Sequence, residues 1–395
     1  MAQHNGLTKP AANHALAGLD HLRALAITLV LIFHYSIFEH PHWVESVGSF
    51  GWTGVDLFFV LSGYLISSQL FDKLVKGQQI SMAEFYIKRT FRILPAYYVT
   101  LLLYFLVPPF REGGEPAPLW KLLTFTENFG LDTRVTHTFT HGWSLCVEEQ
   151  FYLLLPLLLL TSYIFKAGKK AFLIVPVLFV AGFAIRLFVW YYYLVPAQNQ
   201  DGWGSYWTEM MYYPTHTRLD GLLAGVTIAG ITKFTPALAQ RIMRRGNTLM
   251  VISLALLVVC YFMVEKRTSF IASIFGFPMV SIAYGLLVFA AISPSCVLYK
   301  YRSKLTANIA TLSYSIYLTH KSVIHLTHAG FGKLGIAPDS NIMIVISISL
   351  AVLAAIIMRQ VVEKPFLRIR DKILQKRNAK QATAVKPVVV EQTVY

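Results

Sequence analysis

The sequence predicts an all-α, polytopic integral membrane protein: a bundle of about ten transmembrane helices with both termini in the cytoplasm. The chain of 395 residues is 55% hydrophobic and only 14% charged, a composition typical of membrane proteins. Long apolar runs recur along the chain, and lysine and arginine gather in alternate loops. These three observations indicate the fold class before any motif is considered.

Ten apolar runs are long enough to cross a bilayer as helices. They lie at about 19–38, 52–71, 93–110, 142–163, 171–195, 212–232, 247–264, 269–292, 308–332 and 342–363. If the loops are taken alternately, one set carries 24 lysines and arginines and the other set carries 6. Basic loops remain in the cytoplasm, so the first set, which includes both termini, is predicted to be cytoplasmic.

The sequence predicts one folded domain. Residues 1–18 are expected to form a cytoplasmic segment, 19–365 the membrane domain, and 366–395 a basic, disordered cytoplasmic tail. The longest outer loop, 108–141, is too short for a core of its own. The three cysteines have no paired spacing, so neither a disulfide framework nor a metal site is indicated. The net charge of +15 is attributed to topology, and no nucleic-acid partner is expected.

Arg23 and His34 are the most informative pair in the chain. They lie eleven residues apart in one apolar run, which places them on one face of a helix and about 16 Å apart along its axis. Ionisable groups in a transmembrane helix are costly unless they face a polar interior or a pathway. A cation near the inner surface and an imidazole near the outer one indicate a reaction arranged across a bilayer.

Other ionisable groups are predicted in the outer half or near the middle of the membrane. They are Asp56, Glu148, Glu149, His216, Arg218, Asp220, His320 and Lys321. A histidine oriented by a carboxylate is a competent general base for a hydroxyl. The alternative is that these groups form buried ion pairs that hold helices together, for instance Arg218 with Asp220 or with a glutamate. Arg186, in mid-span, is interpreted as a member of a structural pair.

At the inner surface, Arg89 and Arg92 lie close to the predicted depth of Arg23. Guanidinium groups bind phosphates bidentately, so this cluster is a candidate phosphate clamp. The alternative is an ordinary basic segment that flanks a transmembrane helix. Small residues are expected to allow close helix packing, namely Ser62 with Gly63 and the pair Gly221 and Gly225.

Several of these stretches occur together in a fixed order from residue 19 to 365. They are Arg23-(ten residues)-His34, Gly54-Val-Asp-Leu-Phe-Phe-Val-Leu-Ser-Gly-Tyr64, Arg89-x-x-Arg92-x-x-Pro95, Trp143-Ser-Leu-x-Val-Glu-Glu-Gln-Phe-Tyr152, Arg218-Leu-Asp-Gly-Leu-Leu223, Ser313-Tyr-Ser-Ile-Tyr-Leu-x-His320 and Glu363-Lys-Pro365. The ordered set resembles the membrane-bound acyltransferase family 3, which includes bacterial O-antigen, exopolysaccharide and antibiotic O-acyltransferases. Some members carry a C-terminal esterase-like domain that is not seen here, so a stand-alone member is expected.

The resemblance implies an O-acyltransferase in the bacterial inner membrane. Its donor would be cytoplasmic acyl-CoA, usually acetyl-CoA, and its acceptor a hydroxyl of a saccharide, lipid-linked glycan or other glycoside at the outer side, with no metal. We assign the donor to the inner arginine cluster, the base to His34, and its orientation to Glu149 or Glu148. The remaining candidates for the acceptor and the oxyanion are Asp56, Ser62, Arg218, Asp220 and His320.

Direct transfer from thioester to hydroxyl is the favoured mechanism, with a covalent acyl-histidine relay as its alternative. Two rival functions belong to other classes. A transporter or flippase for a lipid-linked sugar would line its path with charges, but no internal repeat is evident. A non-catalytic partner in a polysaccharide-synthesis complex would have little reason to keep costly charges in the outer half of the membrane.

Overall fold

The computed structural model describes residues 9–164, 170 and 173–384, and in this part of the chain it is a bundle of helices without a β-strand. The α-helices are α1 (Lys9–Tyr35), α2 (His42–Gly48), α3 (Gly54–Val75), α4 (Met82–Leu106), α5 (Leu119–Leu123), α6 (Trp143–Ile164), α7 (Ile174–Val189), α8 (Trp203–Trp207), α9 (Asp220–Phe234), α10 (Pro236–Met243), α11 (Gly246–Met263), α12 (Phe277–Ala291), α13 (Val297–Lys300), α14 (Lys304–Gly332), α15 (Asn341–Met358) and α16 (Lys364–Ala384). The shorter elements are the π-helices η5 (Trp190–Leu194), η6 (Thr208–Tyr212), η8 (Ala272–Gly276) and η9 (Arg359–Glu363), and the 3₁₀ turns η1 (Gly51–Thr53), η2 (Pro108–Phe110), η3 (Thr140–Gly142) and η7 (Thr215–Thr217).

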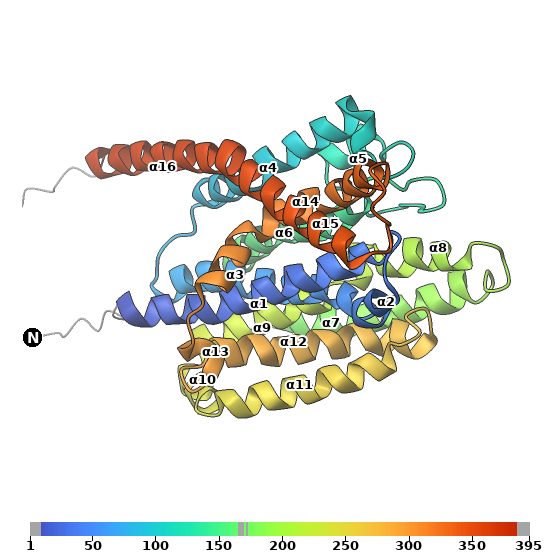
Figure 1. Ribbon diagram of the computed structural model, residues 1–395. Coiled ribbons are helices and arrows are strands. Elements are labelled where there is room, and N and C mark those ends of the chain that lie inside the picture. Colours follow the sequence, from blue (N-terminus) through green and yellow to red (C-terminus); the bar gives the residue numbers. More distant parts are fainter. Residues whose placement is uncertain (1–8, 165–169, 171–172, 385–395) are drawn as a thin grey trace, which may run out of the picture.

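Several of the long helices run side by side, and others cross them at a slant (Figure 1). In Figure 1, α1, α9, α11 and α12 lie across the view, and the start of α1 and the end of α16 are at the same end of the bundle. The short helices α2, α5 and α8 lie toward the opposite end. Helix α1 packs against α3 and α14, and α3 packs against α9. This central group brings residues far apart in the sequence into contact.

A polytopic helical bundle is therefore confirmed. Seven helical segments in the described residues are long and apolar enough to cross a membrane, and the bent pair α9 and α10 would make an eighth. The predicted spans at 93–110, 212–232 and 308–332 correspond to α4, α9 and α14. None of these three helices meets the criterion of length and apolarity by itself. The count of ten and the cytoplasmic placement of the termini stay predictions from the sequence.

The tail prediction needs correction. Residues 366–384 are not a disordered tail but the greater part of α16, which packs against α4. The segment is basic, which suggested disorder, yet it consists largely of residues that form helices well, such as lysine, arginine, leucine, glutamine and alanine. Residues 385–395 lie outside the described part of the chain.

Small residues allow the central helices to approach closely, as the sequence predicted. A Cβ atom added to Gly63 on α3 would lie 2.2 Å from the carbonyl oxygen of Leu222 on α9. At Gly225 on α9, it would lie 2.3 Å from the carbonyl oxygen of Val60. Any larger side chain at either position would push α3 and α9 apart. The contact matters because both helices carry side chains discussed below.

Candidate functional site: two pockets that share a wall

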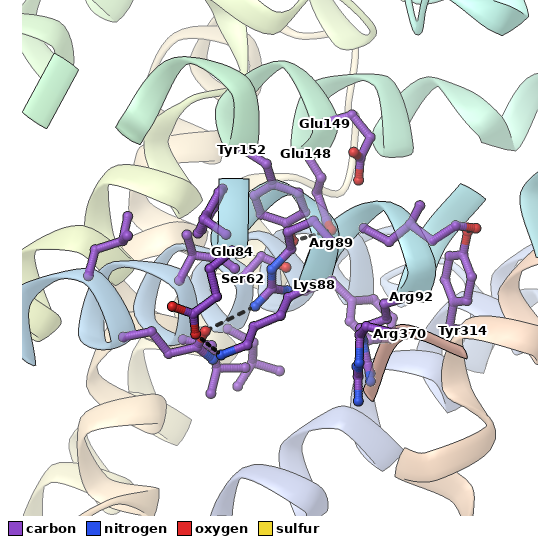
Figure 2. Close-up of a pocket in the computed structure, with 18 of the residues that line it drawn as sticks. Ser62, Glu84, Lys88, Arg89, Arg92, Glu148, Glu149, Tyr152, Tyr314 and Arg370 are labelled. Carbon is purple, nitrogen blue, oxygen red and sulfur yellow. Dashed lines mark hydrogen bonds and ion pairs between the residues drawn. The ribbon is translucent and has the colours of Figure 1, made fainter. Parts of the chain in front are cut away.

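The larger pocket opens among α3, α4, α6, α14 and α16 and has a volume of about 750 Å³. Its walls combine basic, acidic and apolar side chains, and Figure 2 shows them converging from several helices. All three arginines of the predicted phosphate clamp, Arg23, Arg89 and Arg92, line it. We call it the inner pocket, because the sequence predicts that these arginines lie at the cytoplasmic surface of the membrane.

The guanidinium groups of the three arginines differ in how many hydrogen bonds and ion pairs they already make. The Arg23 guanidinium contacts Asp20 at 3.0 Å. Arg89 donates one hydrogen bond to Gln69 at 3.3 Å, and its guanidinium lies 5.6 Å from the ring centre of Tyr152. Among the residues that the structure describes, the Arg92 side chain has neither a hydrogen bond nor an ion pair, and it is exposed. Arg89 and Arg92 therefore retain donors for an anionic ligand.

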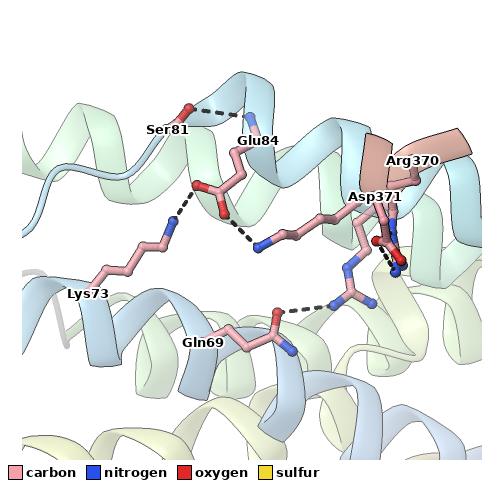
Figure 3. A network of polar contacts seen from close by, with 8 residues as sticks. Gln69, Lys73, Ser81, Glu84, Arg370 and Asp371 are labelled. Carbon is pink, nitrogen blue, oxygen red and sulfur yellow. Dashed lines mark hydrogen bonds and ion pairs between the residues drawn. The ribbon is translucent and has the colours of Figure 1, made fainter. Parts of the chain in front are cut away.

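A network of charged side chains lines the inner pocket near the bend between α3 and α4 (Figure 3). Glu84 accepts from Lys73 at 3.0 Å and from Lys88 at 2.5 Å. The hydrogen bonds from these two lysines, Lys88 first, hold the pKa of the Glu84 carboxyl below its usual range. On α16, Arg370 pairs with Asp371 at 2.7 Å, and both line the same pocket. The helix that replaces the predicted tail thus contributes to the inner pocket.

The second pocket, which we call the outer pocket, has a volume of about 350 Å³. His34 lines it and is 9% exposed. Aromatic rings form much of the wall, and threonines, histidines and one arginine supply polar groups; the lining includes Trp52, Trp143, Trp207, Tyr212, Tyr213, Thr140 and Arg267. A concave aromatic site with a small number of polar groups is a common form of ligand pocket.

Three buried histidines meet at the outer pocket. One ring nitrogen of His34, Nδ1, lies 3.0 Å from Nε2 of His320. The ring centre of His141 lies 6.0 Å from that of His34 and 5.2 Å from that of His320. Next to His320, Lys321 donates to the Thr140 hydroxyl at 3.2 Å. In the described residues, no group of three or more metal-binding side chains has an arrangement that could hold a metal ion.

The inner and outer pockets share a wall about one side chain thick. Tyr317 and Ser144 line the inner pocket, and His141 lines the outer one. The Ser144 and Tyr317 hydroxyl oxygens are 2.6 Å apart, and the Tyr317 hydroxyl donates to the carbonyl oxygen of His141 at 2.6 Å. Tyr317 therefore connects the two pockets and also closes the space between them.

The predicted triad of His34 with a glutamate is not formed. Glu148 and Glu149 line the inner pocket, as does Ser62, and Glu148 accepts from the Tyr152 hydroxyl at 2.8 Å. No hydrogen bond joins either glutamate to His34 within the described ranges. Glu148 lies one helical turn beyond Ser144 on α6, so the contact between Ser144 and Tyr317 separates it from the histidines.

The charged residues near α9 form buried ion pairs rather than a pocket wall. Arg218 pairs with Asp56 at 2.9 Å, and Arg186 pairs with Asp220 at 2.7 Å. All four side chains are at most 4% exposed, and none of them lines the inner or the outer pocket. The structural interpretation of Arg186 is confirmed. For Asp56, Arg218 and Asp220 the geometry favours the alternative of buried ion pairing over direct substrate contact.

Arg218 also lies among aromatic rings below the outer pocket. Its guanidinium carbon is 4.1 Å from the ring centre of Phe277 and 4.6 Å from that of Tyr212. The rings of Trp52 and Trp143 lie at 5.9 Å and 5.5 Å. The Arg218 guanidinium, held by the Asp56 carboxylate, thus contacts several rings at once. Three of these rings line the outer pocket, so Arg218 stabilises its aromatic wall.

His141 is a site residue that sequence reasoning missed. It is 2% exposed, lines the outer pocket, and both of its ring nitrogens lack a hydrogen-bond partner in the described structure. It lies in η3 at the predicted edge of the membrane, where a histidine attracts little attention. Its position two residues before the Trp143 motif was the signal available in the sequence.

Comparison with known proteins places this geometry in a family. A model of an acyltransferase domain, acyltransferase 3, matches residues 16–359. The peptidoglycan O-acetyltransferase OatA of Listeria monocytogenes is 30% identical over 332 residues, which cover 78% of this chain and 49% of the relative. The O-acetyltransferase OatA of Staphylococcus aureus strain NCTC 8325 is 28% identical over 337 residues, covering 80% and 52%. No solved structure matches the chain.

The chain thus spans about half the length of these two relatives. The matched region runs from α1 to the start of η9. It contains the three arginines of the predicted phosphate clamp and the three buried histidines that meet at the outer pocket. The resemblance drawn from the ordered motifs is confirmed: the chain belongs to the acyltransferase 3 family of multi-pass membrane acyltransferases.

Proposed function

We propose that this protein is an O-acetyltransferase of the bacterial inner membrane that moves an acetyl group from cytoplasmic acetyl-CoA to a saccharide hydroxyl at the outer side. The observation that carries the proposal is the pair of pockets separated by Tyr317, one rich in arginine and the other built around His34. Each pocket suits one of the two substrates.

The inner pocket suits the donor. Coenzyme A presents several phosphates and a long flexible arm, and Arg89 and Arg92 offer unused guanidinium donors for such an anion. Apolar side chains such as Phe58, Leu61 and Leu65 line the same pocket. A ligand with an anionic head and a less polar arm matches this mixed lining, and in our proposal its thioester lies toward Tyr317.

The outer pocket suits a sugar. Aromatic rings stack on the apolar faces of saccharides, while Thr140, Arg267 and the histidines supply polar partners for hydroxyl groups. The name of the Listeria relative gives peptidoglycan as its acceptor. We extend that choice to this chain, and propose an amino-sugar glycan or its lipid-linked precursor as the acceptor.

His34 is the proposed base in direct transfer. It takes the proton of the acceptor hydroxyl as that oxygen attacks the thioester carbonyl, forming the ester bond while the carbon–sulfur bond breaks. The protonated imidazole then returns its proton to the coenzyme thiolate. In this scheme Glu148 and Glu149 act on the donor side, since they line the inner pocket.

Sealed inside-out membrane vesicles would test the proposal. Radiolabelled acetyl-CoA, which does not cross membranes, is added outside at the cytoplasmic face, and soluble peptidoglycan fragments are sealed inside. We expect alkali-labile label on the enclosed glycan with the wild-type protein and not with His34→Ala. Movement of a sugar without acetyl-CoA consumption would support a transporter instead. Labelled protein trapped before acceptor is supplied would replace direct transfer by an acyl-enzyme relay.

A further inference from the structure

The hydrogen bond between His34 and His320 determines more than proximity. His34 lies near the end of α1, and His320 lies in the middle of α14, so the bond crosses the packed interface of these two helices. His320 is fully buried, and His34 is nearly so. In such a site each ring nitrogen must be matched to a suitable partner, because water is not present to compensate for a mismatch.

The backbone fixes the proton on His320. Its Nδ1 lies 3.0 Å from the carbonyl oxygen of Ile316 and 2.9 Å from that of Tyr317. Carbonyl oxygens only accept hydrogen bonds, so Nδ1 must carry the hydrogen. A neutral imidazole has one N–H group, and therefore Nε2 of His320 is an acceptor. A second proton would place a cation directly beside Lys321 in a buried site.

The same logic then fixes the proton on His34. Since Nε2 of His320 accepts, Nδ1 of His34 must donate across the 3.0 Å contact. The free lone pair of His34 is then on Nε2, the nitrogen left to meet a hydroxyl in the outer pocket that His34 lines. We infer that His320 is a positioning residue that holds His34 in the tautomer able to act as a base, the role that a carboxylate plays in a catalytic triad.

This inference rests on the proposed function and assigns His320 a role within it. The titratable and charged groups near His34 are His141 from η3, His320 and Lys321 from α14, and Arg267, which lines the same pocket. None of these groups is an acid. A neutral partner orients the imidazole without holding its positive charge as firmly as a carboxylate would, so the proton taken from the hydroxyl is passed on readily to the thiolate.

Two matched substitutions separate positioning from packing. In His320→Gln, the side-chain amide oxygen reaches the former place of Nε2 and can still accept from His34. In His320→Asn, the shorter amide reaches only the former place of Nδ1, so it keeps the contact with the helix carbonyls and loses the acceptor. We expect His320→Gln to transfer acetyl groups within about tenfold of the wild-type rate, and His320→Asn to lose about 10²-fold or more.

A third variant provides a readout that a purely structural role would not change. His320→Glu places a carboxylate at the acceptor position, and we expect the acid limb of the pH–rate profile to move to higher pH by about one unit or more. Equal activity of the glutamine and asparagine variants would overturn the inference, and so would activity in the asparagine variant alone. An unchanged acid limb in His320→Glu would count against it as well.

The wild-type protein offers a test that does not depend on activity. Nitrogen NMR of ¹⁵N-histidine protein in lipid distinguishes the two neutral tautomers, and the His34 signals are assigned by their loss in His34→Ala. We expect His34 to carry its proton on Nδ1; a proton on Nε2 would refute the inference. If the wild-type protein transferred no acetyl group, the proposed function would fail, while this spectrum would still decide the tautomer.

Discussion

The inner and outer pockets use opposite means to bind and process polar groups. The inner pocket is lined by charged side chains on α3, α4 and α16, several of them partly exposed and paired with one another. Aromatic rings and imidazoles line the outer pocket together with a single arginine, Arg267, and its histidines are nearly or completely buried. Charged groups suit the binding of an anion that arrives hydrated, whereas neutral imidazoles suit proton transfer in a site with little water.

The ion pairs below the outer pocket clarify the difference. Arg218 with Asp56 and Arg186 with Asp220 are as deeply buried as the histidines, yet each cation there has an acid at hydrogen-bond distance. Some of their buried atoms have no hydrogen-bond partner in the described structure, among them Nε of both arginines, but none of the four side chains lines a pocket. In the outer pocket, both nitrogens of His141 lack a partner in the described structure, and the contact of His34 uses only one of its nitrogens. Unused hydrogen-bonding capacity on a pocket wall, rather than burial or charge alone, marks the outer site.

Removal of the base should have the largest effect. His34→Ala is expected to lower acetyl transfer by about 10²- to 10⁴-fold, the usual contribution of a general base. Binding of coenzyme A, measured by calorimetry in detergent, should remain within a factor of about two, because the inner pocket is separated from His34 by Tyr317. A large loss of coenzyme binding would mean that the two pockets are not independent.

Removal of the Arg92 side chain should have the next largest effect, and it should affect the donor, acetyl-CoA, rather than the acceptor. Arg92→Ala is expected to raise the KM for acetyl-CoA by about 10- to 100-fold, the value of one charge-assisted hydrogen bond to a phosphate. The turnover number at saturating donor should change little. Arg368→Ala is the matched control, since Arg368 is an exposed arginine on α16 that does not line the pocket. Equal effects of the two substitutions would contradict a specific phosphate contact.

Arg23 and His34 show what the sequence could predict. The helical period places the two residues on one face of a helix, and the charge pattern of the loops predicts which groups lie toward the inside and which toward the outside. Both arguments concern position along a helix axis. The structure places the three arginines in one pocket and His34 in another, while their inner and outer sides and their roles stay predictions.

Position around the axis was harder to predict. Glu148 and Glu149 were expected to orient His34 because their predicted depth was suitable, yet they face the inner pocket. The partner of His34 is set by the packing of α1 on α14, which no local period reveals. For the same reason, the charged residues Asp56, Arg218 and Asp220 suggested a site, but in the packed bundle they are buried as ion pairs.

The wall between the pockets should respond to a smaller change. Tyr317→Phe removes the hydroxyl that holds Ser144 and the carbonyl of His141. With that barrier loosened, we expect hydrolysis of acetyl-CoA in the absence of acceptor to rise by about two- to tenfold, as each lost hydrogen bond is worth about 1 kcal/mol. Tyr314→Phe is the control, because its hydroxyl donates to Ile93 on α4 and lines only the inner pocket. A similar rise in the control would show that the wall lies elsewhere.

The smallest effect should be on stability, and it concerns the loop at the edge of the outer pocket. Glu127 is completely buried there, and neither carboxylate oxygen has a partner in the described residues. Burial raises the pKa of this carboxyl from 4.5 to about 8, although Lys321 and Lys121 oppose the shift. The folded state thus holds the proton more tightly than the unfolded state does, so the free energy of unfolding should fall as pH rises from about 4.5 to about 8.

Glu127→Gln keeps the neutral shape at every pH and should flatten this dependence. We expect it to raise the thermal midpoint in detergent at pH 8.5 by a few degrees and to leave the midpoint unchanged at pH 5. A midpoint that falls at both values would mean that the carboxylate is charged and paired in the folded protein, which would contradict a neutral, buried Glu127.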